Sequence, residues 1–326
     1  MNDVTPEPIM KIAAGFMAAK HLFAANDLGL FAALGGGPRS LADLTRVVDA
    51  PEPSVRVAAD AMVSLGLLRK KEGIYENSTE AQVFLSGTTP ADMRPFLTFW
   101  DQISYPNWEG LTTAMRTRKP GLGKLSDEQT AVFSRGVEAV TSGAARALPE
   151  VYDFSAHRRF LDLGGGTGSF LIPALEKNSG LQATLLESPA VTAVARKRIN
   201  GSAVRDRISV LDGDFFTDDI PAGHDVILMA NVVHLFGHAR NIELLGRVRE
   251  RVAPGAKLLL LDFWTDETRT QPTFAALMAG EFLAVTGEGD VYNEQDVDRW
   301  CEASGWKRLD RRDVAGPASL IVCEAV

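Results

Sequence analysis

The sequence predicts an α/β protein in two parts: a helical N-terminal third, and a C-terminal half built on a largely parallel sheet. Three observations support this prediction. From about residue 157 onward, apolar runs of strand length alternate with helix patterns. These runs are almost continuously apolar, as expected of strands that helices cover on both faces. The first hundred residues, by contrast, are rich in Ala and contain a single hairpin signal.

Length and composition fit a globular protein of two ordinary domains. The 326 residues can bury a large core, and 45% of them are hydrophobic and 23% charged. The net charge of −8 opposes a role on nucleic acid or on an anionic membrane, because binding phosphate needs a basic surface. Cys301 and Cys323 lack metal-ligand spacing and are too few for a disulfide framework. With no apolar stretch of membrane-spanning length and no signal-like N-terminus, we expect a cytoplasmic protein.

The chain begins with a predicted helix over residues 9–25. Ile9, Ile12, Phe16 and Phe23 lie near one face of this helix. Its apolar residues nevertheless lie on more than one side, which is more than a lone surface helix should expose. We therefore expect the N-terminal part of the chain to form a homodimer.

Two more helix patterns, at residues 40–48 and 54–66, precede a hairpin with its turn at residues 72–73. This order is that of a winged helix-turn-helix, a module that can bind DNA. The second helix carries Glu52 and Asp60 against Arg56 alone, whereas a helix that reads a DNA groove would normally be basic or polar. We therefore expect a packing or dimerisation module.

Residues 90–150 are predicted to be helical and are rich in large side chains. Aromatic residues at this density usually form core, and they can also line a flat apolar pocket at a domain junction. The segment 116–124, RTRKPGLGK, separates two helical blocks and is predicted to be a surface turn.

The most informative segment begins at residue 161 and reads LDLGGGTG, a strand that ends in a glycine turn. A short helix and a second strand ending at Glu187 follow it. An acidic side chain there can accept both hydroxyls of a ribose. Gly164, Gly166 and Gly168 give the spacing G-x-G-x-G rather than the G-x-G-x-x-G expected for a pyrophosphate. A ligand with adenosine but no pyrophosphate fits better, and S-adenosylmethionine (SAM) is the common one; a plain glycine turn is the alternative.

The next strand runs into the sequence GDFF at residues 213–216. An Asp at the carboxyl end of such a strand opens onto the crevice where open α/β sheets bind ligands. Asp214 could accept a hydrogen bond from an adenine amino group while Phe215 covers the ring. The alternative is a loop Asp that stabilises its own turn, and Asp218 and Asp219 are expected to begin a turn.

Two further strand ends supply a possible acid–base pair. His234 follows the strand DVILMAN, and Asp262 ends the strand LLLLD. A neutral imidazole could take a proton from a substrate hydroxyl, and a neighbouring carboxylate would fix its tautomer. The alternative is a hydrogen-bonded structural His. His238 lies one helical turn further on and is expected to face solvent. The last two strands, separated by residues 316–317, are predicted to form an antiparallel hairpin at the sheet edge.

Together with FSRGVEA at residues 133–139, the motifs LDLGGGTG, LESP and GDFF and the strand-end His resemble the two-domain SAM-dependent O-methyltransferases. That group includes caffeic acid and hydroxyindole O-methyltransferases and bacterial secondary-metabolite enzymes. The resemblance implies a Rossmann-like SAM methyltransferase domain with an N-terminal, all-helical winged-helix dimerisation domain. The implied boundaries are 1–100 for dimerisation, 101–155 for a helical linker and pocket wall, and 156–326 for catalysis.

The resemblance also implies roles for individual residues. His234 would be the general base and Asp262 its supporting carboxylate. The cofactor would contact Asp162, Gly164, Gly166, Glu187, Asp214, Phe215, Ala230 and Asn231. The substrate pocket would be walled by Trp100, Phe133, Val137, Phe282 and Thr286, with Trp264 nearby.

This chain departs from the family pattern at three positions. Plant members have a second carboxylate beside the base, and its position falls at Val291. A Lys that contacts the cofactor in those enzymes matches Ala230. Metal-assisted C-methylating relatives have an Asp directly after the His, where this chain has Leu235, so no metal is expected.

The leading hypothesis is therefore SAM-dependent, metal-independent O-methylation of a hydroxylated, aromatic small molecule of secondary metabolism. A second hypothesis keeps the SAM site but assigns C-methylation or a non-methylating reaction on a polyketide-like substrate. A third is a winged-helix regulator that senses a metabolite, which the acidic second helix opposes. A nicotinamide-dependent dehydrogenase is opposed by the glycine spacing and by the C-terminal hairpin.

Overall fold

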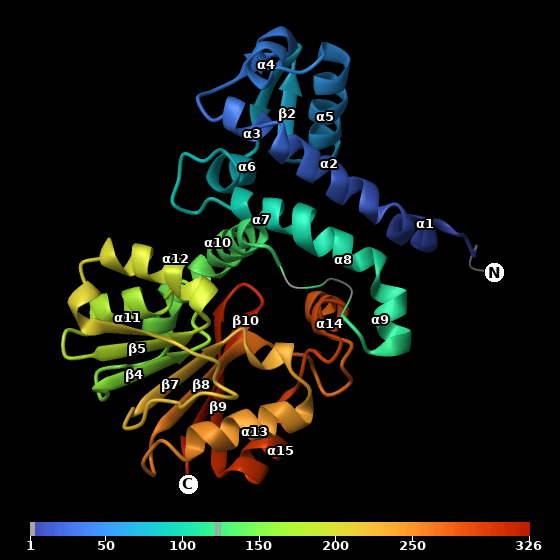
Figure 1. Cartoon of the computed structure of the whole chain (residues 1–326). Coiled ribbons are helices and arrows are strands. Elements are labelled where there is room, and N and C mark those ends of the chain that lie inside the picture. The colour runs from blue at the N-terminus through green and yellow to red at the C-terminus, as the bar shows by residue number, and fades with distance from the viewer. Residues whose placement is uncertain (1–3, 121–122, 124) are drawn as a thin grey trace. The chain divides into compact units, whose positions relative to one another are not determined.

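The computed structural model describes residues 4–120, 123 and 125–326. The chain divides into two compact units, which are described separately here (Figure 1). The first comprises Met1–Ile103 with Arg135–Val140, and the second comprises Ser104–Ser134 with Thr141–Val326. The long helix α10 (Asp127–Val151) contributes residues to both units. The division into three segments with boundaries at residues 100 and 155 stays a prediction.

The first unit is mainly helical and also contains a small three-stranded sheet of order β1-β3-β2. The expected hairpin is confirmed: β2 (Leu68–Lys71) pairs with β3 (Ile74–Asn77), and both turn residues have positive φ, as a two-residue hairpin turn requires. The third strand is β1 (Arg39–Ser40). The helices are α1 (Glu7–Ala13), α2 (Gly15–Asp27), α3 (Leu30–Ala33), α4 (Leu41–Val48), α5 (Glu52–Ser64), α6 (Thr79–Phe84) and α7 (Arg94–Phe99), followed by a π-helical turn at Trp100–Ser104.

The prediction of one continuous helix over residues 9–25 is wrong. Two helices, α1 and α2, meet at Ala14, directly before Gly15, a residue type that destabilises a helix interior. Phe23 is buried, but Ile9, Ile12 and Phe16 are exposed, with Ile12 at 82%. The expected apolar face is therefore largely uncovered in the single chain.

The acidic character of α5 has a structural explanation. Its single basic residue, Arg56, lies 3.4 Å from Asp60 on the same helix. Asp60 also accepts hydrogen bonds from Lys70 and from the Tyr75 hydroxyl, both at 2.8 Å. These contacts tie the helix to the hairpin and neutralise Arg56, which agrees with a packing module.

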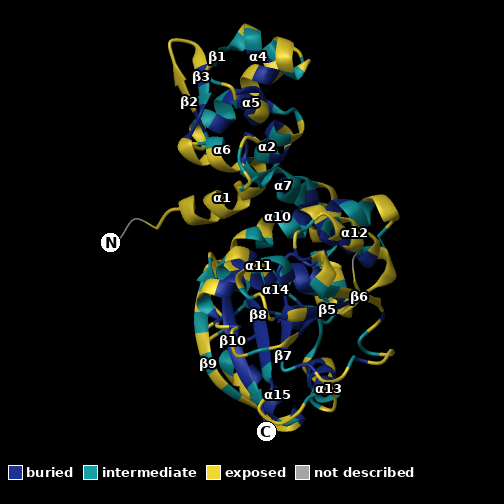
Figure 2. Ribbon diagram, turned by 90° about the vertical axis from the view of Figure 1, so that its left-hand side faces the viewer, coloured by how far each residue is buried: buried dark blue, intermediate teal, exposed yellow. Residues whose placement is uncertain are grey.

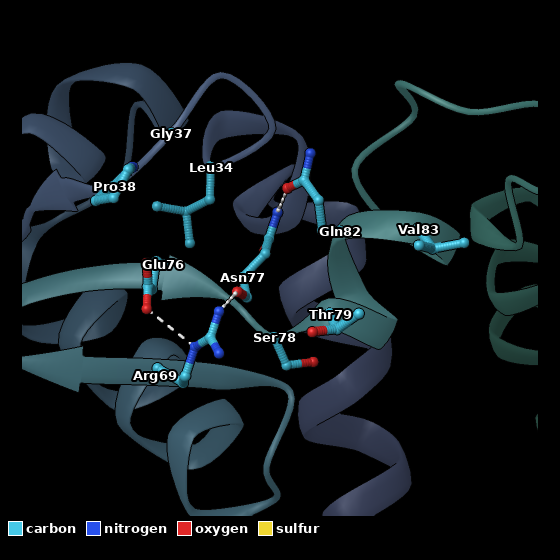
Figure 3. A pocket seen from close by; sticks show the side chains of 10 residues that line it. All are labelled: Leu34, Gly37, Pro38, Arg69, Glu76, Asn77, Ser78, Thr79, Gln82 and Val83. Atoms are coloured by element: carbon cyan, nitrogen blue, oxygen red, sulfur yellow. Dashed lines mark hydrogen bonds and ion pairs between the residues drawn. The ribbon is translucent and has the colours of Figure 1, made fainter.

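A pocket of about 320 Å³ lies within the first unit, between the hairpin and α6 (Figure 3). Its charged side chains, Arg69 and Glu76, pair with each other at 2.9 Å. Arg69 also donates to the backbone oxygen of Asn77, and the Asn77 amide donates to Gln82. The polar groups of this pocket are thus engaged mostly with one another.

The second unit is built on a seven-stranded sheet of order β6-β5-β4-β7-β8-β10-β9. All seven predicted strands are present, and the first five in chain order run parallel. The predicted C-terminal hairpin is confirmed, because β10 pairs antiparallel with both β8 and β9. The strands are β4 (Arg159–Leu163), β5 (Gln182–Glu187), β6 (Ile208–Asp212), β7 (Val226–Ala230), β8 (Lys257–Phe263), β9 (Trp306–Ala315) and β10 (Ala318–Ala325).

Helices cover both faces of this sheet and bury its central strands (Figure 2). On one face α11 (Leu171–Lys177), α12 (Pro189–Asn200) and the end of α10 form one apolar core. On the other face α13 (His238–Arg249) and α15 (Glu294–Ser304) form a second. Cys301 and Cys323 are buried in this second core as free thiols, with their sulfur atoms 3.5 Å apart.

Three more helices of the second unit lie outside these two layers: α8 (Tyr105–Glu109), α9 (Leu111–Thr117) and α14 (Thr273–Thr286). α14 packs against both α8 and α9. The turn predicted at 116–124 follows α9 and is exposed at residues 118–120, whereas residues 121, 122 and 124 lie outside the described part of the chain. No described helix is long and apolar enough to cross a membrane.

Candidate active site

The parallel strands bring most of the predicted site residues to one edge of the large sheet. β4 leads into the glycine turn, β5 ends at Glu187, and β6 is followed by Asp214. β7 leads to His234, and β8 carries Asp262 near its end. Because the carboxyl ends of parallel strands meet at the same edge, side chains that are far apart in the sequence become neighbours.

The glycine turn needs residues without side chains. Gly164, Gly166 and Gly168 have φ values of 70°, 57° and 75°, in the left-handed region that other residues rarely adopt. A Cβ atom on Gly165 would lie only 2.3 Å from the Asp162 carboxyl group. The Glu187 carboxylate is fixed beside the turn, since it accepts hydrogen bonds from the amides of Gly166 at 3.1 Å and Ser188 at 2.6 Å.

Asp162 is fully buried beneath this turn. Neither of its carboxyl oxygens has a hydrogen-bond partner among the described residues. Burial, and then the nearby charge of Glu187, raise the pKa of Asp162 to about 8, so the group is mostly neutral at pH 7. Both oxygens are fully enclosed, so this carboxyl group has neither a hydrogen-bond partner among the described residues nor access to solvent, and its predicted contact with the cofactor stays a prediction.

Asp214 acts in part as a loop residue that stabilises its own turn, which is the alternative to a role in binding adenine. Its Oδ1 accepts a hydrogen bond from the Phe216 amide at 2.8 Å, and Asp218 accepts one from the Asp214 amide at 2.8 Å. Both residues therefore stabilise the turn after β6. Phe215 is half-buried, with its ring edge-on to that of Phe236.

His234 and Asp262 form a buried pair. The Nδ1 atom of His234 lies 2.7 Å from Oδ1 of Asp262, which also accepts the Phe263 amide at 2.7 Å. A carboxylate can only accept, so Nδ1 carries the hydrogen of this bond and Nε2 is the nitrogen able to take up a proton. The structure thus contains the carboxylate–imidazole arrangement that the sequence predicted.

An aromatic ring covers the imidazole. Phe282 stacks on His234 with ring centroids 3.6 Å apart and an interplanar angle of 11°. Val291, at the position of the missing second carboxylate, packs with Phe282 in a small apolar cluster. The Asp290 amide donates to the backbone oxygen of His234 at 3.1 Å. Phe263 also stacks on His234, with ring centroids 6.2 Å apart, so a carboxylate, two rings and a backbone contact surround this imidazole.

The remaining predicted cofactor residues follow β7. Ala230 is buried at the end of the strand. Asn231 has a positive φ of 57°, and its amide donates to the oxygen of Leu261 at 2.8 Å. This conformation turns the chain out of the sheet toward His234.

The predicted wall residues differ in their surroundings. Thr286 on α14 caps the following turn, accepting the Gly289 amide at 2.7 Å, and Phe133 on α10 is partly exposed. Trp264 lies in the hydrophobic core instead, where its indole donates to the Ser319 oxygen at 2.9 Å. Successive strand residues point to opposite faces, so Trp264 is on the face away from Phe263 and has almost no exposed surface. Trp100 and Val137 belong to the first unit.

Comparison with protein families identifies both parts of the chain. Residues 102–307 match the model of the O-methyltransferase domain, and residues 10–87 match that of the O-methyltransferase dimerisation domain. The chain belongs to the O-methyltransferase family. This family uses SAM as methyl donor, so the protein is a SAM-dependent methyltransferase.

Individual relatives support this assignment. The tetracenomycin polyketide synthesis 8-O-methyl transferase TcmO of Streptomyces glaucescens is 27% identical, and the match covers 97% of this chain and 96% of TcmO. The structure of PigF with S-adenosylhomocysteine (SAH) is 25% identical with a TM-score of 0.88, and the match covers 98% and 100% of the two chains. Human N-acetylserotonin methyltransferase, at 24% identity, shares the fold with a TM-score of 0.90 over 99% of both chains.

The residues of this O-methyltransferase fit its cofactor. The glycine turn leaves room for close approach, and Glu187 lies beside it. Both features lie at the carboxyl edge of the large sheet. The assignment of individual contacts stays a prediction.

One further residue of this methyltransferase, Glu281 on α14, is not predicted from the sequence. Its side chain is buried and accepts hydrogen bonds from the Ser104 hydroxyl at 2.7 Å and from the Trp108 indole. Burial raises the pKa of this carboxyl group above its usual value. The available signal was a single acidic residue in the otherwise apolar helix pattern TFAALMAGEFLAV.

Proposed function

We propose that this enzyme methylates a hydroxyl group of a flat, mostly apolar aromatic molecule, with His234 as the general base. The observation that carries the proposal is the buried His234–Asp262 pair at the carboxyl edge of the sheet. Attack on a methyl group requires an oxygen that loses its proton as the bond forms, and an imidazole with a free Nε2 can accept that proton.

Each residue has a defined part in this proposal. SAM, when bound, supplies a methyl group on a positively charged sulfur. Glu187 would accept the ribose hydroxyls. His234 would take the proton of the substrate hydroxyl at Nε2, and Asp262 would hold the tautomer and stabilise the resulting imidazolium. The face of Phe282, 3.6 Å away, would also favour the cationic ring.

The proposed substrate class rests on the relatives and on the side chains near the base. TcmO is named for a polyketide, and other relatives are named for a naphthoate and for mitomycin biosynthesis. Phe133, Phe282 and Thr286 of the second unit are wall residues that we propose, and the roles of Trp100 and Val137, which belong to the first unit, stay predictions. A largely aromatic wall favours a flat ring as substrate.

We also propose a homodimer and retain a cytoplasmic location as a prediction. The match of residues 10–87 to the dimerisation domain supports dimer formation. So do the exposed apolar side chains of α1 and α2, which are Ile9, Met10, Ile12, Phe16 and Met17.

A labelling experiment tests the proposed reaction. The enzyme is incubated with a metabolite extract and SAM that carries a ¹³C methyl group, and products are identified by mass spectrometry. We expect a labelled aromatic ether, whose methyl resonance in NMR is that of a carbon bound to oxygen. A product labelled on carbon would favour C-methylation, and SAM consumption without labelled product would favour a non-methylating reaction.

A further inference from the structure

Glu281 is a buried carboxylate that no cation neutralises among the described residues. It is 6% exposed, and the groups close enough to affect its pKa are two neutral donors, the Ser104 hydroxyl and the Trp108 indole. Both donate to the same oxygen, Oε2. Burying a charged group without an opposite charge costs free energy. Neutral side chains could link the helices at a lower cost in free energy, so a purely structural role does not explain a carboxylate here.

The second oxygen of Glu281 is the informative one. Oε1 accepts no hydrogen bond from the described residues, yet it is not among their fully enclosed unpaired atoms. It therefore retains an open side. The carboxylate is held by one oxygen and presents the other, which is the arrangement of a preorganised acceptor.

Glu281 lies on the same helix, α14, as a residue of the proposed reaction centre. The next residue, Phe282, is the ring that stacks on His234. Ser104 and Trp108 come from the segment that packs against α14, and Trp108 lies so close that a Cβ atom on Gly280 would be 3.1 Å from its ring. Glu281 thus lies in the well-packed contact between α14 and the segment of Ser104 and Trp108, one residue before the ring that covers His234.

We propose that Glu281 is a specificity-determining residue whose Oε1 accepts a hydrogen bond from an N–H or O–H donor of the substrate, on a group other than the hydroxyl that is methylated. This inference rests on the proposed function, since it assumes a substrate beside Phe282. It narrows the substrate class to hydroxylated aromatic molecules with a second hydrogen-bond donor. A buried acceptor discriminates strongly against analogues that lack the donor, because its own hydrogen bond is then unmade.

The substitution Glu281→Gln gives a sharp test. The amide oxygen of Gln can keep the bonds from Ser104 and Trp108, which places the NH₂ group where Oε1 was. A hydrogen-bond donor of the substrate would then face the NH₂ donor of the substituted amide, and no hydrogen bond could form between them. The probes are paired phenols and naphthols that differ only in one amino or hydroxyl group replaced by methyl, and their affinity for the SAH-loaded enzyme is measured by calorimetry, alongside methyl transfer from SAM.

We expect at least one pair in which the wild-type enzyme binds the donor-bearing member about tenfold or more tightly, and we expect Glu281→Gln to abolish that preference. Glu243→Gln, an exposed residue of α13, removes the same charge and should leave the preference unchanged. Ser104→Ala removes a donor from Oε2 only, so it should lower the melting temperature and keep the preference. SAH affinity should be the same in all variants.

Two results would overturn the inference: no pair shows a preference in the wild type, or Glu281→Gln weakens both members of a pair by the same factor, as a structural role would. Failure of the proposed function has a different signature. In that case the pairs show the Glu281-dependent binding preference, but the enzyme transfers no methyl group to oxygen.

Discussion

At the scale of single residues, the proposed chemistry depends on one imidazole held by one carboxylate. Asp262 accepts from both His234 and its own neighbour's amide, and no second carboxylate lies at position 291. The Phe282 and Phe263 rings and the Asp290 amide also contact His234. We therefore expect the proposed base to depend on Asp262.

Asp262→Asn should slow methyl transfer by about tenfold or more, yet by less than loss of the base itself, for which a factor of roughly 10² to 10⁴ is typical. The amide can still occupy the space, but it cannot stabilise an imidazolium. Steady-state kinetics should show a lower kcat with nearly unchanged KM for SAM. An unchanged kcat would mean that Asp262 does not support the base.

Asp162 should make stability depend on pH in the absence of cofactor. Its pKa is about 8 when folded and near its ordinary 3.8 when unfolded, so the folded protein keeps a proton that the unfolded chain releases. This contribution to stability is complete below about pH 4 and is lost as pH rises through 8. Asp162→Asn, which does not titrate, should therefore gain stability relative to the wild type as pH rises from 4 to 8, by several kcal/mol at most, since one unit of pKa difference corresponds to about 1.4 kcal/mol.

Urea unfolding at a series of pH values measures this difference. A gap between wild type and Asp162→Asn that is the same at pH 5 and pH 8 would contradict the buried, neutral state of the carboxyl group.

Glu187→Ala should weaken SAM and SAH alike, by roughly 1.5–3 kcal/mol, the range for a hydrogen bond to a charged group. Both ligands carry the ribose that this carboxylate is proposed to bind. Calorimetry with each ligand provides the measurement. A loss confined to SAM would place Glu187 near the methyl donor instead of the ribose.

At the scale of elements, the sequence predicts the strands of the large sheet well because their apolar runs are long and their ends carry turn residues. It locates Glu187, Asp214, His234 and Asp262 at one edge, since parallel strands fix where their carboxyl ends meet. The burial of some single side chains depends on packing between distant segments, which sequence patterns do not reveal. Trp264 is placed in the core by strand alternation, and the burial of Glu281 arises from contacts with residues more than 170 positions away.

The glycine turn offers a prediction at this scale. Gly165→Ala should lower the free energy of unfolding by about 1–3 kcal/mol, because its Cβ would lie 2.3 Å from the Asp162 carboxyl group. Gly143→Ala on α10 is the matched control: a Cβ there meets no atom within 4 Å, and Ala is favoured in a helix by roughly 0.5–1 kcal/mol. Equal effects of the two substitutions in urea unfolding would contradict the close packing under the turn.

At the scale of the whole molecule, the exposed apolar residues of α1 and α2 are explained by the proposed homodimer. Replacing Ile12 and Phe16 by Asp should convert a dimer into a monomer in light scattering after size exclusion, because charges would be buried at the interface. Both side chains are exposed in the single chain, so its own packing should survive. A double variant that remains dimeric would locate the interface elsewhere.

The central claim is that His234 removes the proton of the substrate hydroxyl during methyl transfer to oxygen. The most direct test compares wild type and His234→Ala for SAH affinity and for the rate of methyl transfer to the acceptor found with labelled SAM, across a range of pH. For His234→Ala we expect unchanged SAH affinity and a rate of methyl transfer that is lower by a factor of roughly 10² to 10⁴. The activity of the wild type should fall at acid pH, where a protonated imidazole cannot accept a proton. This fall should be absent from the variant. A variant that keeps the wild-type rate together with that fall at acid pH would show that His234 is not the base.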